Sequence, residues 1–251
     1  MAAPTLTLAN QNWYRNNVAT LANNAKSIAM AQTRQAINNN LGDVASVRND
    51  TIDIVKNVSE VYGDRAKAIS SQLFDYVMGM EGSNKVGGMW ENEYDESWIQ
   101  GKIRYLAQLI VDWDLEDYID EVGDYASFLV WKSGFDNSWK NATKNGVRWA
   151  RIPNGSKTCA FCYMLASRGF VYTSEEAAGG GFNAYHNLCD CAVIPSVDGN
   201  LKIEGYNREA IYKNYKKAYD NVYKGGMKGQ ELHNAILVEL RKMFKESKEY
   251  I

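Results

Sequence analysis

Histidine, cysteine and proline are scarce in this 251-residue chain, which has two histidines, four cysteines and three prolines. The enzyme motifs HExxH and GxSxG do not occur. The zinc deaminase pattern is also missing, because it needs H-x-E, whereas His186 is followed by Asn187 and Leu188. These absences argue against the enzyme classes that the three motifs define, and they leave the few cysteines and histidines as the main question.

Long apolar runs are absent as well. No stretch approaches the roughly 20 apolar residues of a membrane-spanning helix, so no membrane contact is expected. The first residues lack the charged start and continuous apolar core of a secretory signal. Hydrophobic residues make up 45% of the chain and charged residues 23%, which is typical of a protein with a packed core. The net charge of −2 argues against coating of nucleic acid by bulk electrostatics, although it leaves room for a local basic patch.

All four cysteines lie in one stretch, residues 149–195, together with one of the two histidines. Thiolate and imidazole are the ligands of structural zinc, which takes four of them in a tetrahedron. The sequence therefore predicts a zinc site in this stretch. Its candidate ligands are five residues: Cys159 and Cys162, which form a CxxC knuckle, and His186, Cys189 and Cys191, which form a second cluster.

Five candidate ligands are one more than the four that a tetrahedral zinc site takes. Cys159, Cys162 and His186 are the firmest ligands, and the choice between Cys189 and Cys191 stays open, since residues two apart in an extended segment point the same way. Two other states of the cysteines also stay open. They could be reduced and buried as small hydrophobic residues, or form two disulfides with three possible connectivities. A thioredoxin-like redox pair is disfavoured because the βαβ setting of that motif is absent.

Longer motifs in the same stretch carry a family resemblance. The runs Trp149-Ala-Arg-Ile-Pro, Thr158-Cys-Ala-Phe-Cys-Tyr-Met-Leu-Ala-Ser-Arg-Gly and Tyr185-His-Asn-Leu-Cys-Asp-Cys closely resemble tailed-phage minor head proteins similar to the F protein of phage Mu. The matched block covers about 45 residues. The resemblance implies a structural minor capsid protein, not an enzyme, that binds portal or major capsid protein. It would act in head assembly, DNA packaging or ejection, be present in the phage head and in the host cytoplasm during assembly, and possibly meet phage DNA.

The rest of the chain is predicted to be mainly α-helical. Apolar residues recur every three or four positions, which is the period of a helix face. We expect helical N-terminal and C-terminal regions around a small cysteine/histidine knuckle with short β pieces. The expected regions are a helical region 1–146 (an arm 1–42, a long helix 43–78, and acidic and aromatic helices within 91–145), the knuckle 147–197 and a C-terminal helical pair 198–251. The glycine-rich segment 79–88 is predicted to be a hinge or exposed loop.

Within the knuckle, a short helix is expected after the CxxC pair. A brief strand at residues 170–172 is expected to pair with residues 192–195. Arg151 and Arg168 are predicted either to bond local carbonyl groups or to contact a partner or phosphate.

Two charged regions allow other functions. Residues 91–124 hold eleven Asp or Glu residues against Lys102 and Arg104, and Ile110 and Trp113 continue an apolar helix face through them. The C-terminal region has a basic, tyrosine-bearing face. Each is interpreted first as a solvated helix face. The alternatives are a zinc-dependent hydrolase or nuclease, or a nucleic-acid-binding module that uses the C-terminal face, whose residues are Lys213, Lys216, Lys217, Lys224, Tyr212, Tyr219 and Tyr223.

Overall fold

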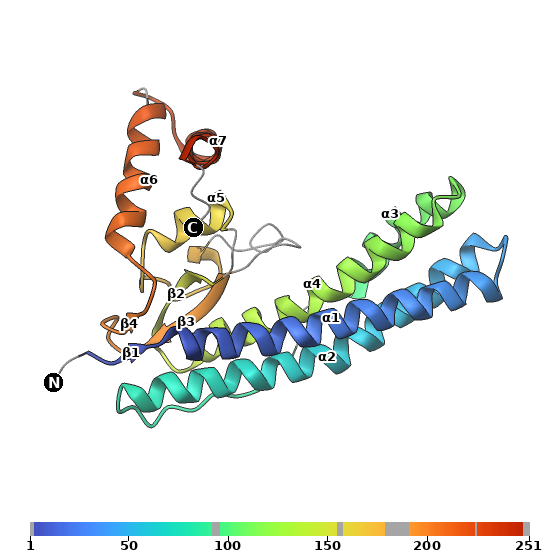
Figure 1. The fold of residues 1–251 in the computed structure, drawn as a ribbon, viewed down its shortest axis with the longest axis horizontal. Helices are drawn as coiled ribbons and strands as arrows, with labels where there is room; N and C mark the ends of the chain where they lie inside the picture. The colour runs from blue at the N-terminus through green and yellow to red at the C-terminus, as the bar shows by residue number, and fades with distance from the viewer. Residues whose placement is uncertain (1–2, 92–95, 155–157, 179–190, 224, 248–251) are drawn as a thin grey trace. The chain divides into compact units, whose positions relative to one another are not determined.

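The protein is mainly α-helical, as the sequence predicts. The computed structural model describes residues 3–91, 96–154, 158–178, 191–223 and 225–247, and their side chains as far as residue 244. Figure 1 shows these elements in chain order. The helices are α1 (Leu8–Asn39), α2 (Val44–Met80), α3 (Glu96–Val111), α4 (Leu115–Lys144), α5 (Ala160–Ala166), α6 (Arg208–Val222) and α7 (Gly229–Ser247), and the strands are β1 (Thr5–Leu6), β2 (Arg148–Pro153), β3 (Cys191–Ser196) and β4 (Lys202–Ile203).

The chain divides into two compact units. Unit 1 comprises residues 1–13, 74–86 and 138–251, and unit 2 comprises residues 14–73 and 87–137. Helices α1, α2 and α4 therefore have residues in both units. Among the described residues, no helix combines the length and the apolar character that crossing a membrane would require.

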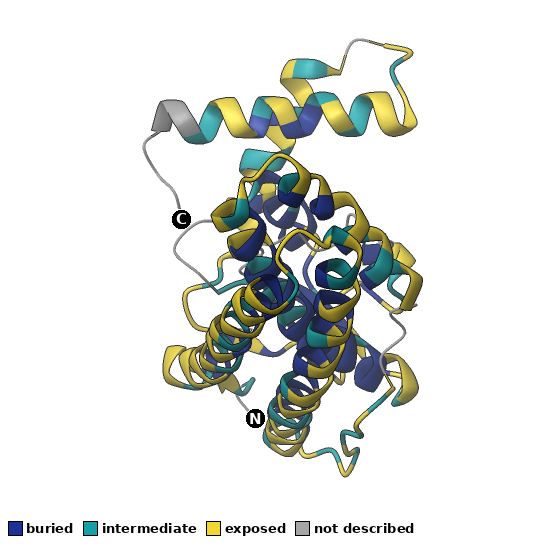
Figure 2. Cartoon of the chain, turned by 90° about the vertical axis from the view of Figure 1, so that its right-hand side faces the viewer, coloured by how far each residue is buried: buried dark blue, intermediate teal, exposed yellow. Residues whose placement is uncertain are grey.

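Unit 2 is a helical bundle built from parts of α1 and α2 with α3 and the first part of α4 (Figure 1). One apolar cluster joins the four helices and includes Ile37 of α1, Val47 of α2, Ile103 of α3 and Ile119 of α4. Figure 2 shows the buried residues on the inward sides of these helices and the exposed residues on their outer sides. The amphipathic spacing in the sequence thus produces the bundle by burying one stripe of each helix.

Local sequence signals set the ends of α2. The Asp43 carboxylate accepts hydrogen bonds from the backbone N–H groups of Ala45 and Ser46, both at 3.1 Å, and caps the first turn. These hydrogen bonds and that of the Ser46 hydroxyl lower the pKa of Asp43. The other end follows the Schellman pattern, in which the Ser83 N–H donates to Met78 and Gly82 has a φ of 69°.

The buried face of α2 runs through Val55 and Val58, whereas Val61 is 51% exposed. The segment predicted as a hinge or exposed loop has no helix or strand after Met80, where α2 ends. It has specific partners within each unit. In unit 2, the Ser71 hydroxyl donates to the Gly88 carbonyl at 2.8 Å. In unit 1, the Asn145 side chain donates to the Val86 carbonyl at 3.1 Å.

Unit 1 is built around the antiparallel pair β2 and β3, with Trp149 opposite Pro195 and Pro153 opposite Cys191. The expected pairing of residues 170–172 with residues 192–195 is therefore wrong. Tyr172 instead forms an isolated bridge to Trp149, and the two rings lie 5.1 Å apart. Trp149 is fully buried between these segments, since β2 pairs with β3 and bridges to Tyr172.

Two helical glycines provide a matched test of packing in unit 2. A Cβ atom added at Gly123 of α4 would lie 2.5 Å from Cγ of Met30 on α1, whereas one added at Gly101 of α3 meets nothing within 4 Å. We expect Gly101→Ala to raise the free energy of unfolding by about 0.5–1 kcal/mol through helix propensity. Gly123→Ala should instead lower it by about 1 kcal/mol by overpacking. Denaturant unfolding of both variants measures the difference, and equal effects would contradict the close packing of α1 on α4.

Candidate functional site

The structure describes three of the five predicted ligands, Cys159, Cys162 and Cys191, and it brings the sulfurs of Cys162 and Cys191 together. Cys159 precedes α5, and its sulfur accepts a hydrogen bond from the Cys162 N–H at 3.3 Å, which caps that helix. Cys162 lies inside α5 and Cys191 begins β3, and both are buried. Their Sγ atoms are 3.5 Å apart. Residues 29 positions apart in the chain are thus joined because α5 packs against the β2–β3 pair.

The predicted ligands His186 and Cys189 lie outside the described residues. Among the residues that are described, no group of three or more His, Cys, Asp or Glu side chains could hold a metal ion. The separation of the Cys162 and Cys191 sulfurs still suits two zinc ligands. Two sulfurs bound tetrahedrally at the usual Zn–S distance of about 2.3 Å lie about 3.8 Å apart. The described thiols therefore fit half of a four-ligand zinc site.

Arg151 of β2 is a buried charge beside these sulfurs. Its exposed fraction is 0%, and its guanidinium donates to Cys191 Sγ from Nη2 at 2.9 Å and from Nε at 3.2 Å. Nη2 also lies 3.5 Å from Cys162 Sγ. Hydrogen bonds from a guanidinium are strongest to ionised acceptors, so this geometry favours thiolate sulfurs at the site. The structure adds these two sulfurs to the partners expected for Arg151, which are local carbonyl groups or an external partner or phosphate.

Aromatic contacts attach the C-terminal helices to the cysteine region. The ring of Phe161 in α5 lies 5.7 Å from the Arg151 guanidinium carbon and 5.9 Å from the ring of His233 in α7. Burial, with a smaller effect of Arg168, lowers the pKa of His233 below its usual value, which keeps this imidazole neutral near pH 7. His233 thus acts as a packing residue between α7 and α5.

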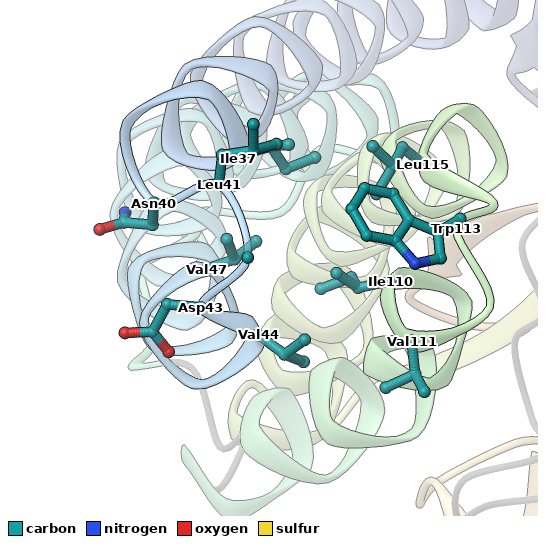
Figure 3. Close-up of a pocket in the computed structure, with 11 residues that line it drawn as sticks. Ile37, Asn40, Leu41, Asp43, Val44, Val47, Ile110, Val111, Trp113 and Leu115 are labelled. Carbon is teal, nitrogen blue, oxygen red and sulfur yellow. The ribbon is translucent and has the colours of Figure 1, made fainter.

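A second candidate site is an apolar pocket in unit 2, between the α1–α2 turn and the α3–α4 turn (Figure 3). Its volume is about 190 Å³. Buried side chains such as Ile110 form its base, whereas Leu41, Val111 and Trp113 are 71%, 55% and 71% exposed. Figure 3 shows the carboxylate of Asp43 directed away from the apolar side chains. The result is a hydrophobic hollow open to solvent at one end of the bundle.

Trp113 is held at this pocket by a strained backbone. It has a φ of 59°, the one positive value among the described residues other than glycine. The Asp114 N–H donates to Leu109 at 2.8 Å and the Trp113 N–H to Ile110 at 3.2 Å, which is the Schellman pattern at the end of α3. The chain places Gly82 and Gly146 at the same position after α2 and α4. A bulky residue at this position is an outlier that points to a function for the exposed indole.

The apolar helix face predicted to continue through Trp113 is therefore wrong at that residue. Helix α3 stops at Val111, and Trp113 lies in the following turn with its side chain exposed. No glycine marks this turn, so helical spacing alone could not separate it from the helix. The only available signal was the pair of aspartates that flanks the tryptophan, because aspartate favours turns.

The surroundings of the pocket are acidic. Asp112, Asp114, Glu116 and Asp117 follow one another within six residues. Coulombic repulsion from Asp114 raises the pKa of the exposed Asp117. Glu116 forms two hydrogen bonds with Arg34, at 2.5 and 2.8 Å, and these lower its pKa. These carboxylates are exposed rather than in the two distinct environments of an acid/base pair, so their effect is a negative potential around the apolar hollow.

The basic C-terminal face lies on α6. Lys216 pairs with Asp220, which partly neutralises this face. The rings of Tyr219 and Tyr223 stack at 5.1 Å, and Lys216 lies over the Tyr219 ring at 5.1 Å. The tyrosines are thus engaged with their own helix. This arrangement agrees with a solvated helix face.

Comparison with known proteins finds sequence similarity to a phage protein. The Gene 15 protein of Mycobacterium phage L5 is 33% identical in an alignment that covers 20% of this chain and 29% of that protein. The chain thus aligns with less than a third of that relative's length. No solved structure matches the chain. This similarity suggests a phage-related protein.

The family is shown by a longer match. The sequence profile of the VG15 protein family matches residues 8–218, which is most of the chain and includes every described residue of both candidate sites. The chain belongs to the VG15 protein family.

Proposed function

We propose that this protein is a structural minor capsid protein of a tailed phage. It acts in head assembly, DNA packaging or ejection through contacts with the portal or major capsid protein, and it is not an enzyme. Membership of the VG15 protein family and the similarity to a phage protein support the phage assignment. The resemblance of residues 149–195 to minor head proteins similar to the F protein of phage Mu supports the finer assignment. The protein's place is the phage head, reached from the host cytoplasm.

The apolar pocket around Trp113 is the single observation that carries the contact with a partner. Exposed tryptophan in an apolar hollow is the feature that most often dominates the energy of a protein interface. The chain keeps tryptophan here although the backbone conformation favours glycine, which costs about 1–2 kcal/mol of stability. A strained residue is retained where it serves a function.

Charge identifies the kind of partner. Asp43 is among the residues that line the pocket, and Asp112 and Asp114 flank Trp113 in the sequence, so a segment with an apolar side chain flanked by lysine or arginine complements it best. We assign this occupant to the portal protein or the major capsid protein of the same phage. The pocket, at about 190 Å³, has room for one or two side chains of such a segment.

A structural zinc ion completes the proposal for unit 1. Cys159, Cys162 and His186 would hold it, with Cys189 or Cys191 as the fourth ligand. The 3.5 Å separation of the Cys162 and Cys191 sulfurs favours Cys191 for that place. The ion would contribute binding free energy to folding, in a unit whose β2–β3 pair has only two strands.

Replacing Trp113 by glycine tests the docking proposal through two effects of opposite sign. We expect Trp113→Gly to raise the free energy of unfolding by about 1 kcal/mol, since glycine adopts positive φ without strain. The same change should weaken binding to the partner about 10-fold or more, because it removes the main apolar contact. Thermal unfolding measures the first effect. Binding to the purified portal and major capsid proteins of the same phage measures the second.

Tyr105 provides the matched control. It lies on α3 of the same unit and is 76% exposed, outside the residues that line the apolar pocket. Tyr105→Ala should leave binding unchanged. Binding of Trp113→Gly with parental affinity, or failure of the parent to bind either purified protein, would refute the docking site.

A further inference from the structure

A cleft in unit 1, separate from the cysteine region, gathers positive charge. Its volume is about 510 Å³, and β2, the turn after α5, β4 and the start of α6 contribute to its walls. Each of these segments supplies one basic side chain: Arg148, Arg168, Lys202 and Arg208. All four residues are exposed, and none forms an ion pair within the described part of the chain. The concentration is notable in a protein whose net charge is −2.

The acidic residue of the cleft does not neutralise this charge. Asp198 is the only carboxylate among the lining residues. Its oxygens accept hydrogen bonds from the backbone N–H and the side chain of Asn200, both at 2.9 Å, and these bonds lower its pKa. Tyr206 adds no negative charge either, because burial raises its pKa to about 12. The basic groups thus exceed the acidic ones by three, since four cations face one carboxylate.

Close packing holds one of the arginines in position. Gly169 has a φ of 70°, and a Cβ atom there would lie 2.9 Å from Cδ of Arg208. The Arg208 side chain therefore runs directly over the backbone of the turn that carries Arg168. Arg208 is also the first residue of α6, so the positive end of the helix dipole adds to the potential at this point.

We infer that this cleft binds the phosphate backbone of DNA. Arginine and lysine are the usual phosphate contacts, and a concave wall of unpaired cations from four segments can follow a phosphodiester chain. A DNA backbone presents successive phosphates, which matches several separated cations better than a single phosphate does. The site differs from the basic face of α6, where Lys216 already pairs with Asp220.

Fluorescence anisotropy of the full-length protein with a labelled 20-base-pair duplex tests this inference. With about four phosphate contacts, the logarithm of the binding constant should fall with the logarithm of salt concentration at a slope of about −3.6. The triple variant Arg148→Gln, Arg168→Gln and Arg208→Gln should reduce that slope to about −0.9 and weaken binding at 50 mM salt about 100-fold or more. Circular dichroism should show unchanged folding, because the substituted side chains are exposed.

The matched control removes the same charge from α6. Lys213→Gln, Lys216→Gln and Lys217→Gln together should leave the parental slope and affinity in place. Equal loss in both variants, parental binding by the cleft variant, or no binding of DNA by the parent at 50 mM salt would each overturn the inference.

Pyrophosphate separates DNA from small phosphorylated ligands. It should displace the duplex only at millimolar concentration. Tight binding of pyrophosphate by a protein that does not bind the duplex would assign the cleft to a free phosphate compound and refute the DNA site. The experiment uses purified protein and DNA alone, so its failure would leave the proposed docking to portal or capsid protein untouched.

Discussion

Replacing both cysteines of the CxxC pair, Cys159→Ser and Cys162→Ser, is expected to remove one equivalent of bound zinc and to unfold unit 1. A structural zinc site contributes about 10–16 kcal/mol in small zinc-binding domains. The whole stability of a domain is about 5–15 kcal/mol. Losing two of four ligands therefore removes free energy comparable to the entire stability of the unit. Elemental analysis measures the zinc, and near-ultraviolet circular dichroism reports the packing of aromatic residues such as Trp149.

Unit 2 serves as an internal control, because its stability should not depend on zinc. Its core cluster contains no cysteine, and it includes Ile103 and Ile119 from α3 and α4. Hydrogen exchange in α3 should therefore stay slow in the double variant while exchange in β2 and β3 becomes fast. A chelator added to the parent protein should produce the same pattern.

The other states of the cysteines give different results in the same measurements. A Cys162–Cys191 disulfide is within reach, because the two sulfurs lie 3.5 Å apart and neither cysteine is in a disulfide in the structure. Mass spectrometry would detect it as a loss of two hydrogens that a reductant restores. A parent protein without zinc, whether its cysteines are reduced or paired, would refute the metal site and leave the proposed role in the phage head to be judged on its own tests.

Most of the helical fold could be predicted from the sequence because local signals agree with the final packing. The long helix expected at residues 43–78 is α2, Val44–Met80. Its apolar period matches the face that it buries, Asp43 caps its start and Gly82 ends it. Where the capping residue, the apolar period and the terminating glycine agree, the local preference of the sequence and the tertiary packing favour the same helix.

The remainder depended on contacts between residues far apart in the chain. Pairing of β2 with β3 could not be read locally, since a short apolar segment such as residues 170–172 has the same pattern as a true partner strand. Arg151 was recognised as a notable polar residue, but its sulfur partners lie 11 and 40 positions away. The spacing predicts a helix face that continues through Trp113, because tryptophan is not one of the residues that favour turns.

Bulk charge was the least informative part of the sequence. A net charge of −2 argued against binding of nucleic acid, yet it is the sum of opposite local potentials. Acidic residues flank Trp113 at the pocket of unit 2 in the sequence, whereas Arg148, Arg168 and Arg208 meet in the cleft of unit 1. Each of these surfaces therefore carries mainly one sign of charge. Because salt screens charges beyond about 8 Å, a bound partner responds to the local charge and not to the net charge.

Arg151→Ala is expected to lower the free energy of unfolding of unit 1 by about 3–5 kcal/mol, which is the usual result of removing one partner from a buried charged pair. The guanidinium lies within 3.5 Å of two sulfurs, so its loss leaves buried thiolates without their donor. Zinc affinity should also fall about 10- to 100-fold, since groups that hydrogen-bond metal ligands support the site to that extent. Denaturant unfolding and competition with a chromophoric chelator measure the two effects.

Two further substitutions separate the charge of Arg151 from its geometry and its position. Arg151→Lys retains the positive charge but loses the planar fork that reaches both sulfurs, so it should recover only part of the stability. Arg148→Ala, three residues earlier on β2, removes an exposed guanidinium and should change stability by less than about 0.5 kcal/mol. If Arg151→Ala is no more harmful than Arg148→Ala, the sulfur contacts of Arg151 carry no stability. The buried arginine would then serve only to fill space beside Phe161, and a methionine there should serve equally well.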